Sequence, residues 1–499
     1  MRFRAIFHAI LCTAIVLTAA MSSADGNNAP HNLGANKYLF LDDFMIAEKS
    51  NVKLVVNPPQ RKELVIIADK PWERGGITSY CNVFWDPNYK QYRLYYVPVD
   101  LGSDPIFRLA LATSKDGIHW QKPNLGAVEW KGSKENNIVI DGQREGTVII
   151  DPNATPDRRY AYVSSHPSIK TRLFTSPDGI NWTMQPKMLS DHHSDSQIST
   201  FWDDQLKKYV HFFKKSTPEL MRCTARVEVD KIDDTWPAHD PIVLSRDDLD
   251  PPRMDLYTNS AEKYRLAENA YLAFPTPYYH YNYSSRKYLN APTLAIGGKT
   301  NDGTIETQLA TSRDGKKWIR YRTPYVPLYH HEELDLRLTM IFPGIIYHET
   351  HIDQYFGGYA FTHGDTQARL RLKGRELGGI FRVQQRIDGF ISADFDYQGG
   401  VLVTEPFVFA GDKLVLNINT SASGEARVGI LDAKGNTIAG HVVADCQFIN
   451  GDYLGKVVTW DKGSDVSDLA GKPIRLRFEM RGTKLYAFQF KPAAKSAKK

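Results

Sequence analysis

The sequence predicts an all-β protein that consists of a five-bladed β-propeller followed by a C-terminal β-sandwich. Three observations predict it. Short runs rich in Tyr, Phe, Val and Ile alternate with Asp-Pro and Asp-Gly turns, one hairpin pattern recurs along the chain, and a second turn motif follows it. Long amphipathic helical patterns are nearly absent, and many short strands separated by turn residues are typical of all-β folds.

The recurring hairpin is an apolar strand, an acidic turn and a second strand that opens with Tyr. Clear copies begin at Val83, Val148, Thr200 and Ile345, and a divergent copy spans 270–295. Five such units over residues 36–384 leave about 70 residues for each blade, which suits four-stranded blades around a central channel. Six blades are the alternative.

A second motif follows several of these hairpins and has the pattern Ser-x-Asp-Gly-x-x-Trp. It occurs at 112–120, 174–182 and 310–318, with a worn copy at 386–390. In such a turn Asp caps the backbone, Gly adopts a positive φ and Trp packs under the loop. We therefore assign these motifs a structural role. Period-two apolar patterning from residue 385 to 492 predicts the β-sandwich as an accessory domain.

The sequence near the N-terminus predicts signal-peptide cleavage and export, and the sequence near the C-terminus predicts a disordered tail. Arg2 and Arg4 precede an apolar stretch over 5–20, and small residues at 22–24 offer a cleavage site, which predicts a signal peptide over 1–24. The stretch is short for a membrane anchor, the rival interpretation. We expect a secreted or periplasmic protein without membrane attachment after cleavage. Residues 493–499 predict a basic disordered tail.

Composition and motifs exclude several classes of function. The net charge of +5 includes no basic stripe, so a nucleic-acid partner is not expected. No dinucleotide or phosphate loop occurs in a suitable context, so no cofactor is predicted. Cys81, Cys223 and Cys446 are odd in number and fit no zinc spacing, so we expect buried free thiols and no metal site.

The propeller, the Asp-Gly turns and the C-terminal sandwich together resemble the invertase- and levanase-like clan of five-bladed glycoside hydrolases. The turns resemble the Asp-boxes of sialidases. The resemblance implies an enzyme acting on a glycosidic bond, with a carbohydrate as substrate. The clan's nucleophile lies in an Asn-Asp-Pro motif of the first blade, whereas residues 78–83 hold no carboxylate here. No catalytic residue is therefore transferred from the family.

Candidate site residues lie just before the hairpins, because the innermost strand of each blade borders the central channel. Glycoside cleavage needs two carboxyl groups, and we select Asp195 and Glu268, each of which precedes an apolar strand. Asp255 is the third candidate. Adjacent histidines point to opposite faces of a strand, so His192 and His193 are not expected to share a metal ion with Asp195. The predicted substrate-binding residues are polar side chains near the same positions: His192, His193, Gln197, Asn137, Arg253, Tyr257, Arg337 and His363.

These observations favour a glycoside hydrolase that acts on a poly- or oligosaccharide by carboxylate acid/base catalysis in the central pocket. A non-catalytic glycan-binding propeller and a polysaccharide lyase are the alternatives. The aromatic run over 278–283 fits a stacking wall for sugars and ordinary strand packing equally well.

Overall fold

The computed structural model describes residues 29–492 except 144, 220, 282–301, 329, 332–333, 366–367 and 369–370. The predicted signal peptide and basic tail lie outside the described residues, as does part of the aromatic run. The described chain is mainly β, with short 3-10 turns such as Pro71–Glu73 and Pro156–Arg158 and a few α-helical residues near Ala368. Among the described residues, no helix combines the length and the apolar character needed to cross a membrane.

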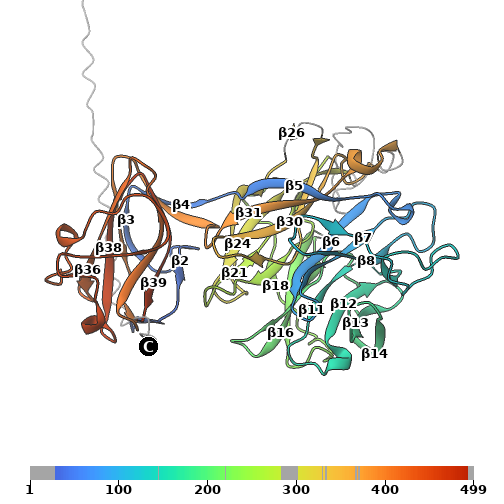
Figure 1. Ribbon diagram of the computed structural model, residues 1–499, viewed down its shortest axis with the longest axis horizontal. Coiled ribbons are helices and arrows are strands. Elements are labelled where there is room, and N and C mark those ends of the chain that lie inside the picture. The colour runs from blue at the N-terminus through green and yellow to red at the C-terminus, as the bar shows by residue number, and fades with distance from the viewer. Residues whose placement is uncertain are drawn as a thin grey trace, which may run out of the picture.

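In the described part of the chain, five mainly antiparallel sheets and a two-stranded sheet of β26 (His330–His331) and β27 (Leu334–Asp335) form the larger lobe (Figure 1). The first three sheets use strands that are nearly consecutive in the chain. Sheet 1 contains β6 (Ile77–Asp86), β7 (Gln91–Pro98), β8 (Arg108–Ser114) and β10 (Ile138–Asp141). Sheet 2 contains β11 (Glu145–Ile150), β12 (Tyr160–His166), β13 (Lys170–Ser176) and β14 (Thr183–Ser190). Sheet 3 contains β15 (Ser199–Asp203), β16 (Lys208–Ser216), β17 (Arg222–Val229) and β18 (Ile242–Leu244).

The last two sheets combine segments that are further apart. Sheet 4 contains β20 (Ala261–Lys263), β21 (Tyr271–Ala273), β24 (Thr307–Ser312) and β25 (Ile319–Val326). Sheet 5 contains β28 (Leu338–Ile341), β30 (His351–Tyr359), β31 (Gly378–Arg386) and β5 (Gln60–Ile67), with β29 (Ile346–Tyr347) beside β30. β19 (Met254–Leu256), β22 (Pro277–His280) and β23 (Gly303–Ile305) extend its other edge. The divergent hairpin predicted from residue 270 actually begins at β20.

Parts of the chain from all five sheets surround one channel of about 290 Å³. Its lining comes from β6, β11, β15 and β20, and from Pro343 and Gly344, which follow β28. We call these segments the inner strands. Polar bridges link neighbours around the channel: the Asn82 side-chain amide donates to the Val148 carbonyl and its oxygen accepts from the Val148 N–H, at 2.8 and 3.0 Å. The channel identifies which strands face the centre.

The acidic turn and the Tyr that opens the next strand form a repeated contact between neighbouring sheets, which we call the Asp–Tyr latch. Tyr160 of sheet 2 donates to Asp86 of sheet 1 at 2.7 Å, and Tyr209 of sheet 3 donates to Asp151 of sheet 2 at 2.5 Å. Tyr271 of sheet 4 donates to Asp203 of sheet 3. The recurring sequence pattern therefore encodes contacts between successive units rather than within one hairpin.

The Ser-x-Asp-Gly-x-x-Trp turns have the geometry that the sequence predicts. In the second copy the Gly179 N–H donates to Ser176 Oγ at 2.8 Å, and Asp178 accepts the N–H groups of residues 180 and 181 at 2.8 Å. Gly179 has φ +73°, and Trp182 donates its indole N–H to the Gly179 carbonyl at 3.2 Å. The copies at 114–120 and 312–318 repeat these bonds. The worn copy differs, because Asp388 instead accepts from Lys37 and Tyr264.

Residues near the N-terminus belong mostly to the smaller lobe. This lobe has two sheets. The first contains β1 (His31–Gly34), β34 (Phe407–Phe409), β38 (Ile474–Arg481), β33 (Gly400–Thr404), β3 (Ile46–Ser50) and β36 (Glu425–Asp432). The second contains β37 (Asp452–Val457), β35 (Lys413–Asn419), β39 (Thr483–Lys491), β32 (Ile391–Phe395), β4 (Val52–Val56) and β2 (Tyr38–Leu39). One hydrophobic core joins the two sheets, including Leu402 and Phe478 from the first and Leu414 and Phe488 from the second.

The N-terminal boundary of the larger lobe thus differs from the expected residue 36, because the described chain up to Val56 pairs with C-terminal strands. The next strand, β5, crosses to the larger lobe and pairs with β31 of sheet 5 (Figure 1). Sheet 5 is therefore completed by residues that precede sheet 1 in the chain.

Candidate functional site

The inner strands run in the same direction, so the larger lobe has two distinct ends. The Ala261 N–H donates to Ser199 Oγ at 3.1 Å where β20 and β15 begin, and Lys263 Nζ donates to Asp203 at 2.8 Å where both strands finish. We call the side where inner strands begin the entrance end, and the side where they turn into the next strand the hairpin end.

The predicted acid/base pair does not converge. Asp195 precedes β15 and lies at the entrance end, whereas Glu268 lies in the turn between β20 and β21, at the hairpin end. The Glu268 carboxylate accepts from the Asn36 amide at 2.5 Å. The two carboxylates are separated by the length of an inner strand and cannot act on one bond together.

The entrance end brings together side chains that are far apart in the sequence. Tyr80 Oη lies 2.8 Å from Tyr257 Oη and 3.4 Å from the Asp195 carbonyl oxygen. Ser196 Oγ donates to the Tyr257 carbonyl at 3.3 Å. Tyr80 belongs to β6, the serine precedes β15, and Tyr257 precedes β20. The segments leading into three different sheets therefore meet at one place.

Two of the predicted catalytic carboxylates lie at this end, in opposite environments. Asp195 forms an ion pair with Lys214 and its side chain is 48% exposed. Asp255 is fully buried, with Arg222 Nη1 and His280 Nε2 each 3.1 Å from its oxygens. Burial opposes ionisation of Asp255, but the His280 hydrogen bond and the Arg222 charge outweigh it and lower the pKa of the carboxyl. Asp255 is thus a buried anion that fixes its neighbours.

Aromatic rings surround this buried charge. The Arg222 guanidinium lies over the rings of Tyr257 and Tyr278, at 5.3 and 5.6 Å from their centroids. His363 contacts both rings with centroid distances of 4.8 Å and shares a 3.2 Å hydrogen bond with Tyr278 Oη. Tyr257 and His363, both predicted from the sequence, therefore lie beside Asp255.

Several buried polar atoms at the entrance end have no hydrogen-bond partner within the described structure. They are Gln197 Oε1, Thr258 Oγ1 and both amide atoms of Asn259. The three residues line one small enclosed cavity that Lys214 and Tyr257 also border. Buried polar groups in folded proteins are almost always satisfied by protein, water or ligand. This cluster therefore has an unmet capacity for hydrogen bonding that the fold itself does not use.

Other predicted substrate-binding residues have structural contacts. His192 Nε2 lies 2.8 Å from the Lys214 carbonyl oxygen, and the Gln197 amide donates to the Gly146 carbonyl at 2.5 Å. Asn137 is fully buried and accepts from the Trp72 indole at 3.0 Å. Arg253 donates to the Tyr281 carbonyl at 3.2 Å. Arg337 is exposed and His193 is half-buried in the loop before β15.

Glu145 is a carboxyl group at the entrance end that the sequence did not identify. It is the first residue of β11 and is fully buried. The residue predicted for this unit was Asn137, which directly precedes β10 of sheet 1. The available signal was position: Glu145 directly precedes an apolar strand, as Asp195 does.

A larger cavity of about 560 Å³ lies at the hairpin end and is lined by Glu262, Glu268, Trp202, Lys37 and Gln489, among others. Glu262 also borders the central channel. Burial raises the pKa of the Glu262 carboxyl to about 7, although the Gly344 and Ile345 N–H groups oppose this effect. Two carboxyl groups, those of Glu262 and Glu268, therefore line this cavity.

No protein-family model and no curated protein matches the chain in sequence. Solved structures of similar fold include an N-acetylgalactosamine deacetylase from F. plautii in complex with blood group B trisaccharide, with 12% identity and a TM-score of 0.41 over 68% of this chain and 96% of that one. A putative glycoside hydrolase from Bacteroides ovatus has 16% identity and a TM-score of 0.41, covering 66% and 96%. A family 43 arabinoxylan arabinofuranohydrolase from Bacillus subtilis has 10% identity and a TM-score of 0.37, covering 83% and 96%. The function proposed below rests on this chain's own side chains.

Proposed function

We propose that the protein is an exported glycoside hydrolase whose carbohydrate site lies at the entrance end of a five-bladed β-propeller. In this proposal the five sheets around the central channel are the blades, and β5 closes the ring by completing sheet 5. The two C-terminal sheets that share one core form a β-sandwich. The shared channel lining and the pairing of β5 with β31 support this architecture.

The observation that carries the proposal is the unpaired polar cluster beside the exposed Asp195 carboxylate. Sugar hydroxyls donate and accept hydrogen bonds, and the Asn259 amide, whose two polar atoms are both without a partner in the described structure, offers both functions. Tyr80 and Tyr257 add ring surface next to them. The enclosed cavity has no room even for a water molecule, so we assign the sugar to its outer side, against Asp195, Lys214 and Tyr257.

The three carboxyl groups at this end divide into different roles. Lys214 holds Asp195 as an exposed carboxylate, which suits a base or a nucleophile. Asp255 is an anion already paired with Arg222 and His280, so it positions Arg222 and Tyr257 and does not transfer a proton. Glu145 remains as the proton donor, because hydrolysis needs one carboxyl that starts protonated. Its assignment is the part of the proposal that is easiest to test.

The test is a panel of plant and algal polysaccharides incubated with the purified mature protein. New reducing ends indicate hydrolysis, ultraviolet-absorbing unsaturated products indicate a lyase, and retention without products indicates a binding protein. On a cleaved substrate, Asp195→Asn and Glu145→Gln are each expected to lower kcat by about 100-fold or more. Asp191→Asn removes an exposed carboxylate from the same loop and serves as the matched control.

Glu262→Gln is the decisive companion variant because it alters the hairpin-end cavity. If this variant is inactive while Asp195→Asn keeps wild-type activity, the catalytic site lies at the hairpin end and our assignment is wrong. Export is tested separately: the N-terminus of protein recovered from outside the cytoplasm should begin after residue 24.

A further inference from the structure

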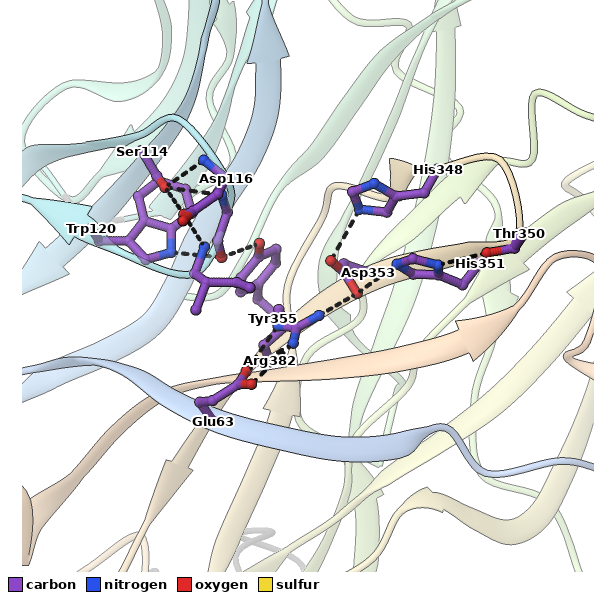
Figure 2. Close-up of polar contacts among 12 residues, drawn as sticks. Glu63, Ser114, Asp116, Trp120, His348, Thr350, His351, Asp353, Tyr355 and Arg382 are labelled. Atoms are coloured by element: carbon purple, nitrogen blue, oxygen red, sulfur yellow. Dashed lines mark hydrogen bonds and ion pairs between the residues drawn. The ribbon is translucent and has the colours of Figure 1, made fainter.

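The hairpin between β29 and β30 carries two histidines and an aspartate whose side chains converge. Figure 2 shows His348, His351 and Asp353 pointing toward one another, with Arg382 and Glu63 behind the aspartate. In the described part of the chain, this is a group of three residues whose possible metal-ligating atoms all lie within 4.8 Å of one another. None of the three belongs to the proposed carbohydrate site.

The backbone explains why these side chains meet. The His348 N–H donates to the His351 carbonyl at 2.9 Å and closes the hairpin, and Ile346 pairs with Asp353 across the two strands. His351 and Asp353 are two residues apart on β30, so their side chains project from the same face. The loop then returns His348 over that face, where its ring stacks on His351 with centroids 4.4 Å apart.

The donor atoms suit a divalent transition cation. His348 Nε2 lies 3.1 Å from one Asp353 oxygen, and His351 Nε2 lies 4.0 Å from the other. In tetrahedral Zn²⁺ sites, bond lengths of about 2.0–2.1 Å place neighbouring ligand atoms about 3.3 Å apart. Small rotations of the two imidazoles therefore bring all three atoms to that spacing. Two imidazoles and one carboxylate are ligands that Zn²⁺ prefers.

We propose that His348, His351 and Asp353 bind one Zn²⁺-like divalent transition cation, leaving further positions for water. The two histidines are 29% and 31% exposed, which gives the ion a path from solvent. Asp353 is 3% exposed, so it forms the fixed inner wall of the site. This site differs from the sequence-based expectation of no metal, because that expectation considered only the three cysteines and the adjacent pair His192 and His193.

Surrounding residues orient the ligands as second-layer groups do in metal sites. Thr350 Oγ1 lies 3.1 Å from His351 Nδ1, which leaves Nε2 directed toward the cluster. Arg382 donates to Asp353 at 2.8 Å and fixes its carboxylate. Glu63 lies 2.9 Å from Arg382 and offsets its positive charge, which would otherwise oppose a nearby cation. A cation at this place is therefore not faced by an uncompensated guanidinium.

The experiment is a Zn²⁺ titration by calorimetry of the purified mature protein after removal of metal with a chelator. We expect wild-type protein to bind one Zn²⁺ more than the His348→Ala/His351→Ala double variant at pH 7.5. Glu63→Gln should weaken this site about 10- to 100-fold, because Arg382 then competes for Asp353. His119→Ala is the matched control: His119 also contacts an aspartate, Asp116, at 2.7 Å, but no second histidine joins them.

Equal Zn²⁺ stoichiometry and affinity in wild type and double variant would overturn the proposal. Co²⁺ gives an independent measurement on wild-type protein alone, should the double variant fail to fold. Intense visible absorption bands of a low-coordinate Co²⁺ site, displaced by Zn²⁺, are expected. Absence of these bands at saturating Co²⁺ would equally refute the site.

Discussion

The Asp–Tyr latch makes a quantitative prediction about how the larger lobe is held together. Replacing Tyr209 by Phe removes one hydroxyl from a buried side chain, since Tyr209 is 2% exposed. Its hydroxyl donates to Asp151 at 2.5 Å and accepts from the Asn153 amide at 3.0 Å. A hydrogen bond to a charged group contributes about 1.5–3 kcal/mol. We therefore expect Tyr209→Phe to lower the free energy of unfolding by about 2 kcal/mol.

Tyr160→Phe should cost less, because Asp86 keeps its second partner, Arg93 Nε, at 2.9 Å. Guanidinium denaturation with tryptophan fluorescence measures both changes, through the midpoint at unchanged m-value. Tyr397→Phe is the control, because Tyr397 is 64% exposed and its substitution should change stability by less than about 0.5 kcal/mol. If Tyr209→Phe is as stable as this control, the latch does not stabilise the contact between sheets 2 and 3.

Three further predictions concern single residues. Gly179→Ala should destabilise more than Gly126→Ala, because both glycines have positive φ but only at Gly179 would a Cβ clash with Tyr95 Oη and Arg93 Nη1; thermal unfolding compares them. Asp255→Asn should lower the free energy of unfolding by about 3–5 kcal/mol, because Arg222 and His280 then lose their buried anion. Since the folded-state pKa of Asp255 is lowered, the greater stability of the wild type should be present above about pH 4. Denaturation curves should show it disappear as pH falls through that lowered pKa. Glu262 has a raised pKa of about 7, so the stability that it contributes should be fully present below about pH 4.5 and lost as pH rises through 7. In Glu262→Gln, the change in the free energy of unfolding over this pH range should be smaller than in the wild type by about 2–3 kcal/mol.

The sequence predicted most hairpins because their signals are local. Acidic turns and Tyr-led strands mark sheets 1, 2, 3 and 5 at the expected positions. The fourth copy was misplaced because β20 and β21 contain only three residues each, too few to show alternation. The pairing of β2 to β4 with strands that lie more than 300 residues later leaves no local signal, so the true extent of the smaller lobe became visible only in the structure.

The error at Glu268 follows from that misplaced hairpin. Both Asp195 and Glu268 precede apolar strands, but Asp195 precedes an inner strand, whereas Glu268 precedes β21, the second strand of its sheet. Because the fourth hairpin was predicted to begin at residue 270 and not at 261, Glu268 was expected at the entrance end, whereas it lies at the hairpin end. Asp255 and Tyr257 lie at the entrance end, because they precede the start of β20 at Ala261 by only a few residues.

The position of a carboxylate along the repeated unit separates structural from functional groups. At the hairpin end, Asp86, Asp151 and Asp203 each accept a hydrogen bond from a tyrosine of the next sheet, so their presence is explained by the latch. At the entrance end, Asp195 forms an ion pair with Lys214, and Asp255 forms ion pairs with Arg222 and His280. Burying the charge of Asp255 there is costly, and its contact with Arg222 both joins β17 of sheet 3 to β19 of sheet 5 and arranges Tyr257 beside the exposed Asp195. A buried charge that also orders the surroundings of an exposed carboxylate has the strongly perturbed environment that is common at functional sites.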